Sequence, residues 1–336
     1  MAIPNEKKER IAHSVIKVLY SRFSSFPENY NNNRNAPFHI AFLNAFKSRL
    51  KGRVKNIPDY ISLSSWMHGL NTSLGQSFFE SVAHILCDGE KRDFKGKKIY
   101  TKQISAIADI MINLKNGETR PSLIQENKII QDTANGSLQI ASNFTADCFF
   151  ETNDKVVAIE LKSVRPNSGE MRGEKHKILQ SKAILQLLYP HKTVYYFFGF
   201  PFDPTAETEI SYNKIRFLKY LVEAEKFLDE KELLIADELW SYLAGSKNAM
   251  SEILNIINTI ATPRFMDIFN QIQSITPQNM SQYQQILNNW FLYSELSILK
   301  KIPSIITDPS KQRILNQTIF KPDGSYNNNR LRLLQI

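Results

Sequence analysis

The feature that most constrains the fold of this chain is a pair of β-forming stretches joined by a turn dipeptide. Residues 144–151 and 155–163 are rich in β-branched and aromatic side chains, and the Asn-Asp dipeptide at 153–154 lies between them. Such a dipeptide suits the two-residue turn of a β-hairpin. The register that this turn imposes places Asp147 directly opposite Glu160, with their Cβ atoms about 5 Å apart on one face of the sheet.

The segments that follow the hairpin predict how the sheet is completed. Residues 174–188 have the apolar spacing of a helix, and residues 193–200 are a nearly continuous run of β-branched and aromatic side chains. Such a run is typical of a strand that is buried on both faces. A strand, a helix and a second strand in this order place the helix against the sheet. The sequence therefore predicts an α/β fold with a small mixed sheet flanked by helices.

Helical patterns dominate the rest of the chain, which is mostly helical from Tyr212 onward. The remaining helices are expected over residues 6–23, 37–50, 74–87, 101–114 and 121–130. Asn71 or Thr72 is expected to cap the third of these. The chain should have three parts, which are a basic helical N-terminal region at 1–73, a core at 74–200 and a mainly helical C-terminal region at 201–336.

Composition and charge narrow the class of protein. The 336 residues are 42% hydrophobic and 11% aromatic, which excludes a disordered chain. Lys and Arg number 42 against 33 Asp and Glu, and residues 1–60 hold 11 basic and 4 acidic side chains. A surplus concentrated in this way favours a polyanionic partner, with nucleic acid ahead of an anionic membrane.

Cysteine content and hydropathy indicate the compartment. Cys87 and Cys148 are too few for a disulfide framework or a cysteine-rich zinc site. No window approaches the roughly 18 uncharged apolar residues of a membrane span, and the N-terminus lacks the apolar core of a signal peptide. We therefore expect a soluble, cytoplasmic protein without a membrane partner.

The hairpin brings together three side chains that can support hydrolysis of a phosphodiester. Lys162, two residues after Glu160, lies on the face that Asp147 and Glu160 share. Two carboxylates at this separation can hold Mg²⁺, which keeps several waters and accepts phosphate oxygens as further ligands. Lys162 would orient the attacking water or help to deprotonate it. Asp147, Glu160 and Lys162 are therefore the candidate catalytic residues, with Asp147 and Glu160 as metal ligands.

The alternative is a salt-bridge ladder on an exposed sheet face. Acid-x-Lys triplets are common in a chain with 28 lysines, and five occur here. Only the Glu160 triplet combines a strand, apolar neighbours and a facing Asp at a matched register. The other four lie in loops or in helical contexts; they begin at Glu6, Asp93, Glu126 and Asp229.

Asp147 followed by Glu160-Leu161-Lys162 in a hairpin resembles the core of the PD-(D/E)XK nucleases. Ala146 stands where the family name has Pro, a position without a ligand role. The resemblance covers residues 74–200 and implies a restriction-endonuclease-like fold. It also implies an acidic residue on the helix before the sheet, for which Glu80 is the match; the alternative for Glu80 is an exposed helix carboxylate.

The stretch after the hairpin, SVRPNSGEMRGEKHKILQSKA, looks like that of type II restriction endonucleases of the TdeIII type. Such enzymes are associated with GGNCC-like sites. A loop that contains Gly169 and Gly173 is expected to present side chains to DNA before the helix begins. Arg172 can donate two hydrogen bonds to guanine, and Glu170 can accept one from cytosine. The expected phosphate contacts come from Lys175, Lys177 and Lys182; the alternative is a solvated helix face.

The sequence thus predicts a Mg²⁺-dependent endonuclease that cuts double-stranded DNA at a short GC-rich palindrome. One chain supplies one site and two strands must be cut, so a symmetric homodimer is the simplest arrangement. A cognate DNA methyltransferase would be its genetic partner. Two alternatives stay open, which are a structure-selective nuclease of repair or mobile-element origin and a DNA-binding protein that has lost the metal.

Overall fold

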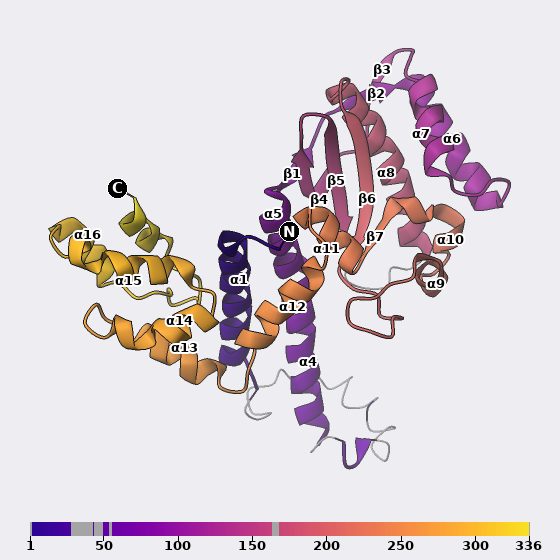
Figure 1. Cartoon of the computed structure of the whole chain (residues 1–336). Helices are drawn as coiled ribbons and strands as arrows, with labels where there is room; N and C mark the ends of the chain where they lie inside the picture. The colour runs from indigo at the N-terminus through magenta and orange to yellow at the C-terminus, as the bar shows by residue number, and fades with distance from the viewer. Residues whose placement is uncertain (1, 28–42, 44–49, 54–55, 163–167, 336) are drawn as a thin grey trace. The chain divides into compact units, whose positions relative to one another are not determined.

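The computed structural model describes residues 2–27, 43, 50–53, 56–162 and 168–335, with the backbone alone for residues 168–170. The chain divides into two compact units (Figure 1). Unit 1 consists of residues 1–3 and 79–254, and unit 2 consists of residues 4–78 and 255–336. The predicted N-terminal and C-terminal helical regions therefore contribute to one unit, because segments from both ends of the chain pack together. The predicted boundaries after residues 73 and 200 differ from the boundaries of these units.

The centre of unit 1 is a five-stranded mixed sheet with the order β1-β4-β5-β6-β7. Strands β1, β4 and β5 are antiparallel neighbours, whereas β5, β6 and β7 are parallel. A separate two-stranded sheet pairs β2 with β3. The strands are β1 Glu90–Phe94, β2 Lys98–Tyr100, β3 Leu138–Ile140, β4 Phe144–Glu151, β5 Lys155–Leu161, β6 Thr193–Phe200 and β7 Leu233–Ile235.

Helices cover both faces of this sheet (Figure 1). Helix α8 covers the face on which Glu160 lies, because Lys177 of α8 contacts the Glu160 carboxylate. The other face is covered by α5 and α11, since Cys87 of α5 contacts Cys148 of β4. The helices of unit 1 are α5 Phe79–Cys87, α6 Thr101–Asn116, α7 Leu123–Asp132, α8 Ser168–Leu188, α9 Lys214–Tyr220, α10 Ala224–Phe227, η4 Glu230–Glu232 and α11 Asp237–Ala244, and α12 Ala249–Ile260 spans the unit boundary.

The predicted β4-β5 hairpin, the crossover helix and the strand at 193–200 are confirmed. The buried part of β6 is its C-terminal half, Tyr196 to Phe200, whereas its first three residues are partly or fully exposed. The predicted Asn71 or Thr72 cap is wrong, because residues 57–87 are helical throughout. The helix starts after Asn56, whose side chain accepts a hydrogen bond from the Asp59 amide, with Pro58 in the first turn.

Unit 2 is helical. Its α1 begins with an acidic residue in the first turn, which suits the positive end of a helix dipole, and it packs against α4, α13 and α15. The apolar side chains Ile11, Val15 and Ile16 of α1 are buried. The helices are α1 Asn5–Ser24, α4 Ile57–Ser73, the π-helix η3 Leu74–Phe78, α13 Phe265–Gln273, η5 Met280–Tyr283, α14 Gln284–Asn289, α15 Tyr293–Ile305, α16 Pro309–Leu315 and η6 Asn328–Leu334.

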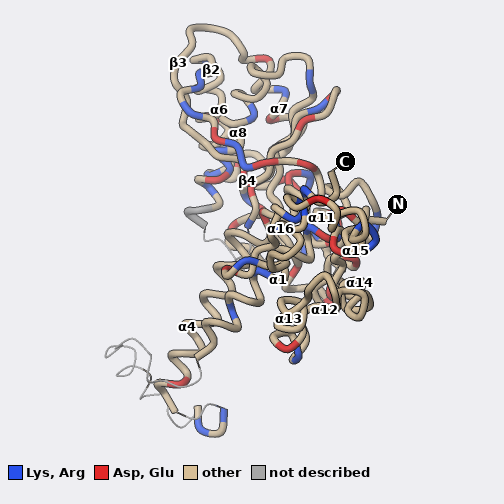
Figure 2. The backbone as a smooth tube through the Cα atoms, turned by 90° about the vertical axis from the view of Figure 1, so that its left-hand side faces the viewer, with Lys and Arg blue, Asp and Glu red and all other residues tan. Residues whose placement is uncertain are grey.

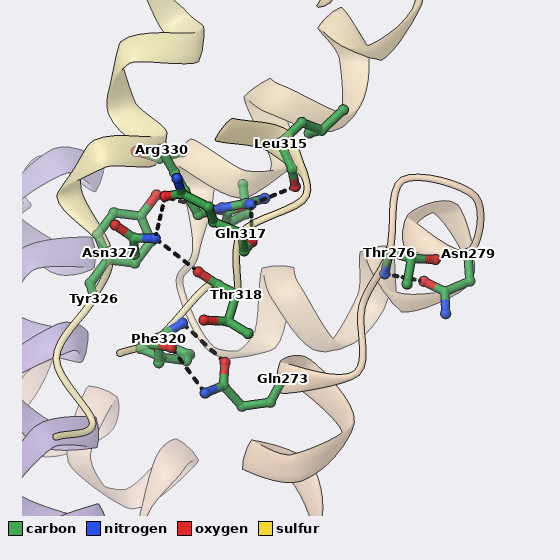
Figure 3. A network of polar contacts seen from close by, with 12 residues as sticks. Gln273, Thr276, Asn279, Leu315, Gln317, Thr318, Phe320, Tyr326, Asn327 and Arg330 are labelled. Atoms are coloured by element: carbon green, nitrogen blue, oxygen red, sulfur yellow. Dashed lines mark hydrogen bonds and ion pairs between the residues drawn. The ribbon is translucent and has the colours of Figure 1, made fainter. Parts of the chain in front are cut away.

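A buried ion pair fixes the C-terminal segment of unit 2. The Arg330 guanidinium donates hydrogen bonds to both carboxylate oxygens of Glu295, at 2.8 and 2.7 Å. It also donates to the backbone oxygens of Leu315 and Gln317 (Figure 3). Such a two-pronged contact is the strongest form of an Arg–carboxylate pair. The last helices of the chain are therefore held by polar contacts as well as by apolar packing.

Charge is distributed over both units. In Figure 2, segments with Lys or Arg and segments with Asp or Glu both occur at many places along the chain. Of the basic residues in 1–60, Arg34, Lys47, Arg49 and Lys55 lie outside the described residues, as does nearly all of the helix expected at 37–50. Within the described part of the chain, no helix is both long and apolar enough to cross a membrane.

Candidate active site

The hairpin places the candidate carboxylates as its turn predicts. The Thr152 amide donates a hydrogen bond to the Lys155 carbonyl at 2.9 Å, which closes the two-residue turn. Cys148 pairs with Ile159 across the strands. The next step of the same register sets Asp147 opposite Glu160, and the Asp147 Oδ2 accepts a hydrogen bond from the Leu161 amide at 3.0 Å. This bond fixes one oxygen of Asp147 against β5.

Glu160 is buried at the end of β5, with 7% of the residue exposed. Burial raises the pKa of its carboxyl, and the negative charge of Asp147 raises it further, while Lys177 and Lys162 oppose the shift. The Lys177 ammonium donates a hydrogen bond to Glu160 Oε2 at 2.7 Å. Two ionised carboxylates as close as Asp147 and Glu160 repel each other unless a cation lies between or beside them. This pair of acids therefore has the electrostatics of a cation-binding site.

Lys162 lies beside Glu160, as expected for a shared face. Its Nζ is 3.2 Å from Glu160 Oε1 and 2.8 Å from Glu174 Oε1. Burial alone would lower the pKa of Lys162, but the hydrogen bond to Glu174 and the charge of Glu160 raise it above its usual value. Lys162 therefore carries a positive charge next to the two carboxylates that the hairpin brings together.

Glu80 joins the site through a lysine of the neighbouring strand. The Lys91 Nζ of β1 is 3.1 Å from Glu80 Oε2 and 3.5 Å from Asp147 Oδ1. Glu80 of α5 is thus linked to the hairpin carboxylate, and only 17% of its side chain is exposed. The alternative of a fully solvated helix carboxylate does not describe Glu80 in this structure.

The phenol of Tyr196, on β6, is buried and is affected by the same carboxylates. Burial raises its pKa well above the usual 10, and the charges of Glu160, Glu174 and Asp147 add to the effect in that order. Negative charges from a strand hairpin and from α8 therefore act on the same buried hydroxyl. The site is bounded by β4, β5, β6 and α8.

Two of the expected phosphate contacts are not compatible with the structure. Lys175 and Lys182 share one face of α8, as their spacing predicts, but this face is directed inward and both side chains are buried. The Lys175 Nζ lies 2.6 Å from carboxylate oxygens of both Glu126 and Glu232, and the Lys182 Nζ lies 3.0 Å from Glu232. Ammonium groups that are desolvated and paired in this way do not reach a DNA backbone.

The expected DNA-contacting loop is also wrong, because Ser168–Leu188 is a single helix. Gly169 and Gly173 lie on α8 and not in a loop. Arg172 is exposed on this helix, and Lys177 is part of the candidate site through Glu160. The side chain of Glu170 lies outside the described residues.

Lys91, Glu174 and the contact of Lys177 with Glu160 were not predicted from the sequence. The Glu174–Lys177 spacing of one helical turn is a signal that could have drawn attention to α8. Lys91 gives no such signal, because the charged sequence Glu90–Phe94 does not resemble a strand.

The donor set fits a hard divalent cation. Asp147 and Glu160 supply carboxylate oxygens from two adjacent strands, which is the ligand type that Mg²⁺ and Ca²⁺ prefer. No group of three or more His, Cys, Asp or Glu side chains arranged to hold a metal ion occurs among the described residues. A cation at Asp147 and Glu160 would complete its shell with water and phosphate oxygens.

Two comparisons with known proteins agree on the family. The sequence model of "Type II restriction endonuclease, HinfI" matches residues 3–261. The type II restriction enzyme MjaII of Methanocaldococcus jannaschii is 42% identical over 360 residues, which covers 98% of this chain and 96% of that enzyme. This chain belongs to the HinfI family of type II restriction endonucleases. As a HinfI-family member it is a site-specific deoxyribonuclease, and the clustered acids and lysines of unit 1 are its candidate catalytic centre.

The family assignment confirms the expected restriction enzyme. The match is to the HinfI family, and the TdeIII-type resemblance stays a prediction. The sequence left two alternatives open, a repair nuclease and an inactive DNA-binding protein. The HinfI match and the likeness to MjaII support neither of them.

Proposed function

We propose that the chain cuts double-stranded DNA through a PD-(D/E)XK site formed by Asp147, Glu160 and Lys162, with Glu80 as the acidic residue of the preceding helix. The observation that supports this most strongly is the hairpin register, which sets two carboxylates and an ammonium group on one face beneath α8. The family requires hydrolysis of DNA, and this is the cluster of described residues whose chemistry suits that reaction.

Asp147 and Glu160 would hold Mg²⁺. When bound, the ion supplies a positive charge for the scissile phosphate and lowers the pKa of a coordinated water. The Leu161 amide occupies Oδ2 of Asp147, whereas Oδ1 faces the Lys91 ammonium group at 3.5 Å and would be the oxygen that binds the ion. Glu80 lies on the far side of Lys91 and would bind a water of the coordination shell.

Lys162 would act as a hydrogen-bond donor at the reacting phosphate. Its ammonium group, held between Glu160 and Glu174, can orient the attacking water and oppose the charge that develops on the phosphate oxygens. The carboxylates of the site repel the phosphate of DNA unless a metal cation or an ammonium group compensates the negative charge. Binding of the phosphate and of the metal should therefore be coupled.

Recognition would involve the exposed side of α8, which follows β5 after residues 163–167. Arg172 is the described side chain of this helix that combines exposure with two parallel donors for guanine. We propose a short GC-rich palindrome as the target, GGNCC-like in form, cut by a homodimer in which each copy supplies one site. The DNA methyltransferase that protects the same sequence would be its genetic partner.

The test is digestion of a random-sequence plasmid library in Mg²⁺, followed by sequencing of the ends. Discrete ends that share a GG and CC palindrome are the expected result. Discrete ends around another palindrome would leave the nuclease assignment intact and refute the GGNCC-like target. Scattered ends would refute sequence-specific recognition, and intact plasmid with purified, folded protein would refute the proposed activity. Sedimentation of the protein with and without cognate DNA checks the dimer.

A further inference from the structure

A fourth carboxylate, Glu174 of α8, lies in the candidate site although the hairpin motif does not require it. Its Oε1 accepts a hydrogen bond from Lys162 Nζ at 2.8 Å, a shorter contact than the 3.2 Å between Lys162 Nζ and Glu160 Oε1. Glu160 and Lys162 belong to the same strand end, whereas Glu174 comes from the helix that covers it. Lys162 is therefore held from two different elements.

The contacts of Glu174 close a ring of alternating charge. Lys177, one helical turn after Glu174, lies 3.7 Å from Glu174 Oε2 and 2.7 Å from Glu160 Oε2. We call these four residues the α8 charge ring: Glu160, Lys162, Glu174 and Lys177. Each lysine of the ring lies between the same two carboxylates, so the ring fixes the direction of both ammonium groups relative to Glu160.

Glu174 occupies its place at an energetic cost. Only 15% of its side chain is exposed, and its Oε2 is buried without a hydrogen-bond partner among the described residues. A buried carboxylate oxygen without a hydrogen bond destabilises a fold, and the charge of Lys177 at 3.7 Å offsets part of this cost. Such groups are uncommon in native proteins, and those that occur require an explanation from strain or function.

The fold does not need Glu174 to hold α8 in place. Ile178, Leu179 and Ile184 of this helix are buried in the core, and Lys175 and Lys182 tie its inner face to Glu126 and Glu232. The contact of Glu174 with Lys162 adds little to this attachment. Its effect is local, on the position of a flexible lysine with four rotatable side-chain bonds.

We propose that Glu174 is a positioning residue for Lys162, which it holds against the reacting phosphate, an assignment that rests on the proposed function of the hairpin site. Without Glu174, the Lys162 ammonium group loses the shorter of its two contacts in the ring, at 2.8 Å, and keeps the contact with Glu160 at 3.2 Å. The ammonium group then gains freedom to turn away from the phosphate. Displacements of about 1 Å in a reacting group can reduce rates by about 100-fold.

The experiment compares Glu174→Gln with wild type by single-turnover cleavage of plasmid DNA and by equilibrium DNA binding. Gln keeps the shape of Glu and removes its charge. We expect the cleavage rate to fall by about 10- to 100-fold while the Kd for DNA changes less than about twofold. Glu174→Asp, which keeps the charge on a shorter stem, should recover part of the rate. Glu225→Gln on α10 is the matched control, because Glu225 is an exposed helix carboxylate of the same unit.

Three results would overturn the assignment. These are a Glu174→Gln rate within about twofold of wild type, a loss of DNA affinity as large as the loss of rate, and a Glu174→Asp rate no higher than that of Glu174→Gln. Thermal unfolding of each variant excludes misfolding as the cause. Lys162→Ala separates this inference from the proposed function. Normal cleavage by Lys162→Ala would refute the proposed site itself. Loss of cleavage by Lys162→Ala together with normal cleavage by Glu174→Gln would refute only the role of Glu174.

Discussion

The Lys175 ammonium group lies 2.6 Å from a carboxylate oxygen of Glu126, and both side chains are buried. The two residues come from α8 and α7, and Glu232 of η4 completes the contact from a third segment. Burial would raise the pKa of the Glu232 carboxyl, but the charges of Lys175 and Lys182 lower it below its usual range. The lysine that the sequence offers as a DNA contact is thus an internal tie between three elements.

Removal of this tie should destabilise the protein and should not act selectively on DNA. Lys175→Ala leaves Glu126 and Glu232 buried without their shared cation, and breaking a buried ion pair in this way costs about 3–5 kcal/mol of the free energy of unfolding. Urea unfolding followed by circular dichroism measures the change. Lys192→Ala, at a partly exposed lysine that pairs with Glu151, is the control. Unchanged stability together with a reduced salt dependence of DNA binding would restore the phosphate-contact hypothesis for Lys175.

Loss of either facing carboxylate should abolish cleavage and preserve DNA binding. Asp147→Ala and Glu160→Ala each remove one ligand of the proposed metal, which acts on the chemical step. We expect the single-turnover rate to fall by at least about 1,000-fold, with DNA affinity unchanged or slightly higher because a negative charge is lost. Lys162→Ala should also lower the cleavage rate, but with DNA affinity unchanged or slightly lower because a positive charge is lost. Wild-type cleavage by either the Asp147 or the Glu160 variant in Mg²⁺ would refute the assignment of this pair as the metal site.

Replacement of Mg²⁺ by Ca²⁺ should support DNA binding without turnover. Ca²⁺ takes the same oxygen ligands at longer distances and with a less strict geometry, so it can bind the carboxylates and the phosphate without aligning the attacking water. Gel-shift and cleavage assays on the same DNA in each ion test this. Cleavage in excess chelator would contradict a metal-dependent mechanism.

Arg172 should contribute to specificity through its planar guanidinium group. Arg172→Lys keeps the positive charge but loses the pair of parallel donors, so binding to random DNA should hold while discrimination at one guanine falls by about 1–3 kcal/mol. Cleavage of the cognate plasmid and of single-base variants is compared with affinity for random DNA. Equal losses on all sequences would mean that Arg172 contacts only the backbone.

Acid sensitivity of unit 2 should depend on His13. Its ring stacks on Tyr326, with ring centroids 4.1 Å apart, and burial lowers the pKa of His13 from 6.5 to about 3. The unfolded chain therefore binds a proton at higher pH than the folded chain does. The contribution to stability is complete above pH 6.5 and declines by about 1.4 kcal/mol per pH unit as the pH falls toward 3. His13→Phe should show a shallower decline in unfolding experiments across this range, and an equal decline would refute the assignment to His13.

The local part of the site was predictable and the distant part was not. Two residues of turn fix the hairpin register, so the relation of Asp147 to Glu160 follows from neighbouring sequence alone. The partners of Lys175 lie 49 and 57 residues away in the chain, and helix periodicity does not show which face a lysine will bury. Strand β1 escaped detection because edge strands tolerate charged side chains, which hide the alternating pattern.

The two sets of contacts on α8 have a consequence for where the DNA is cut. Lys175 and Lys182 tie the helix to the interior, while Lys177 ties it to Glu160 of the hairpin. A helix fastened on two sides cannot slide along its axis or rotate without breaking one set of charges. If an exposed side chain of α8 reads a base and the hairpin carboxylates form the active site, as proposed, the distance between that base and the hydrolysed bond would be constant.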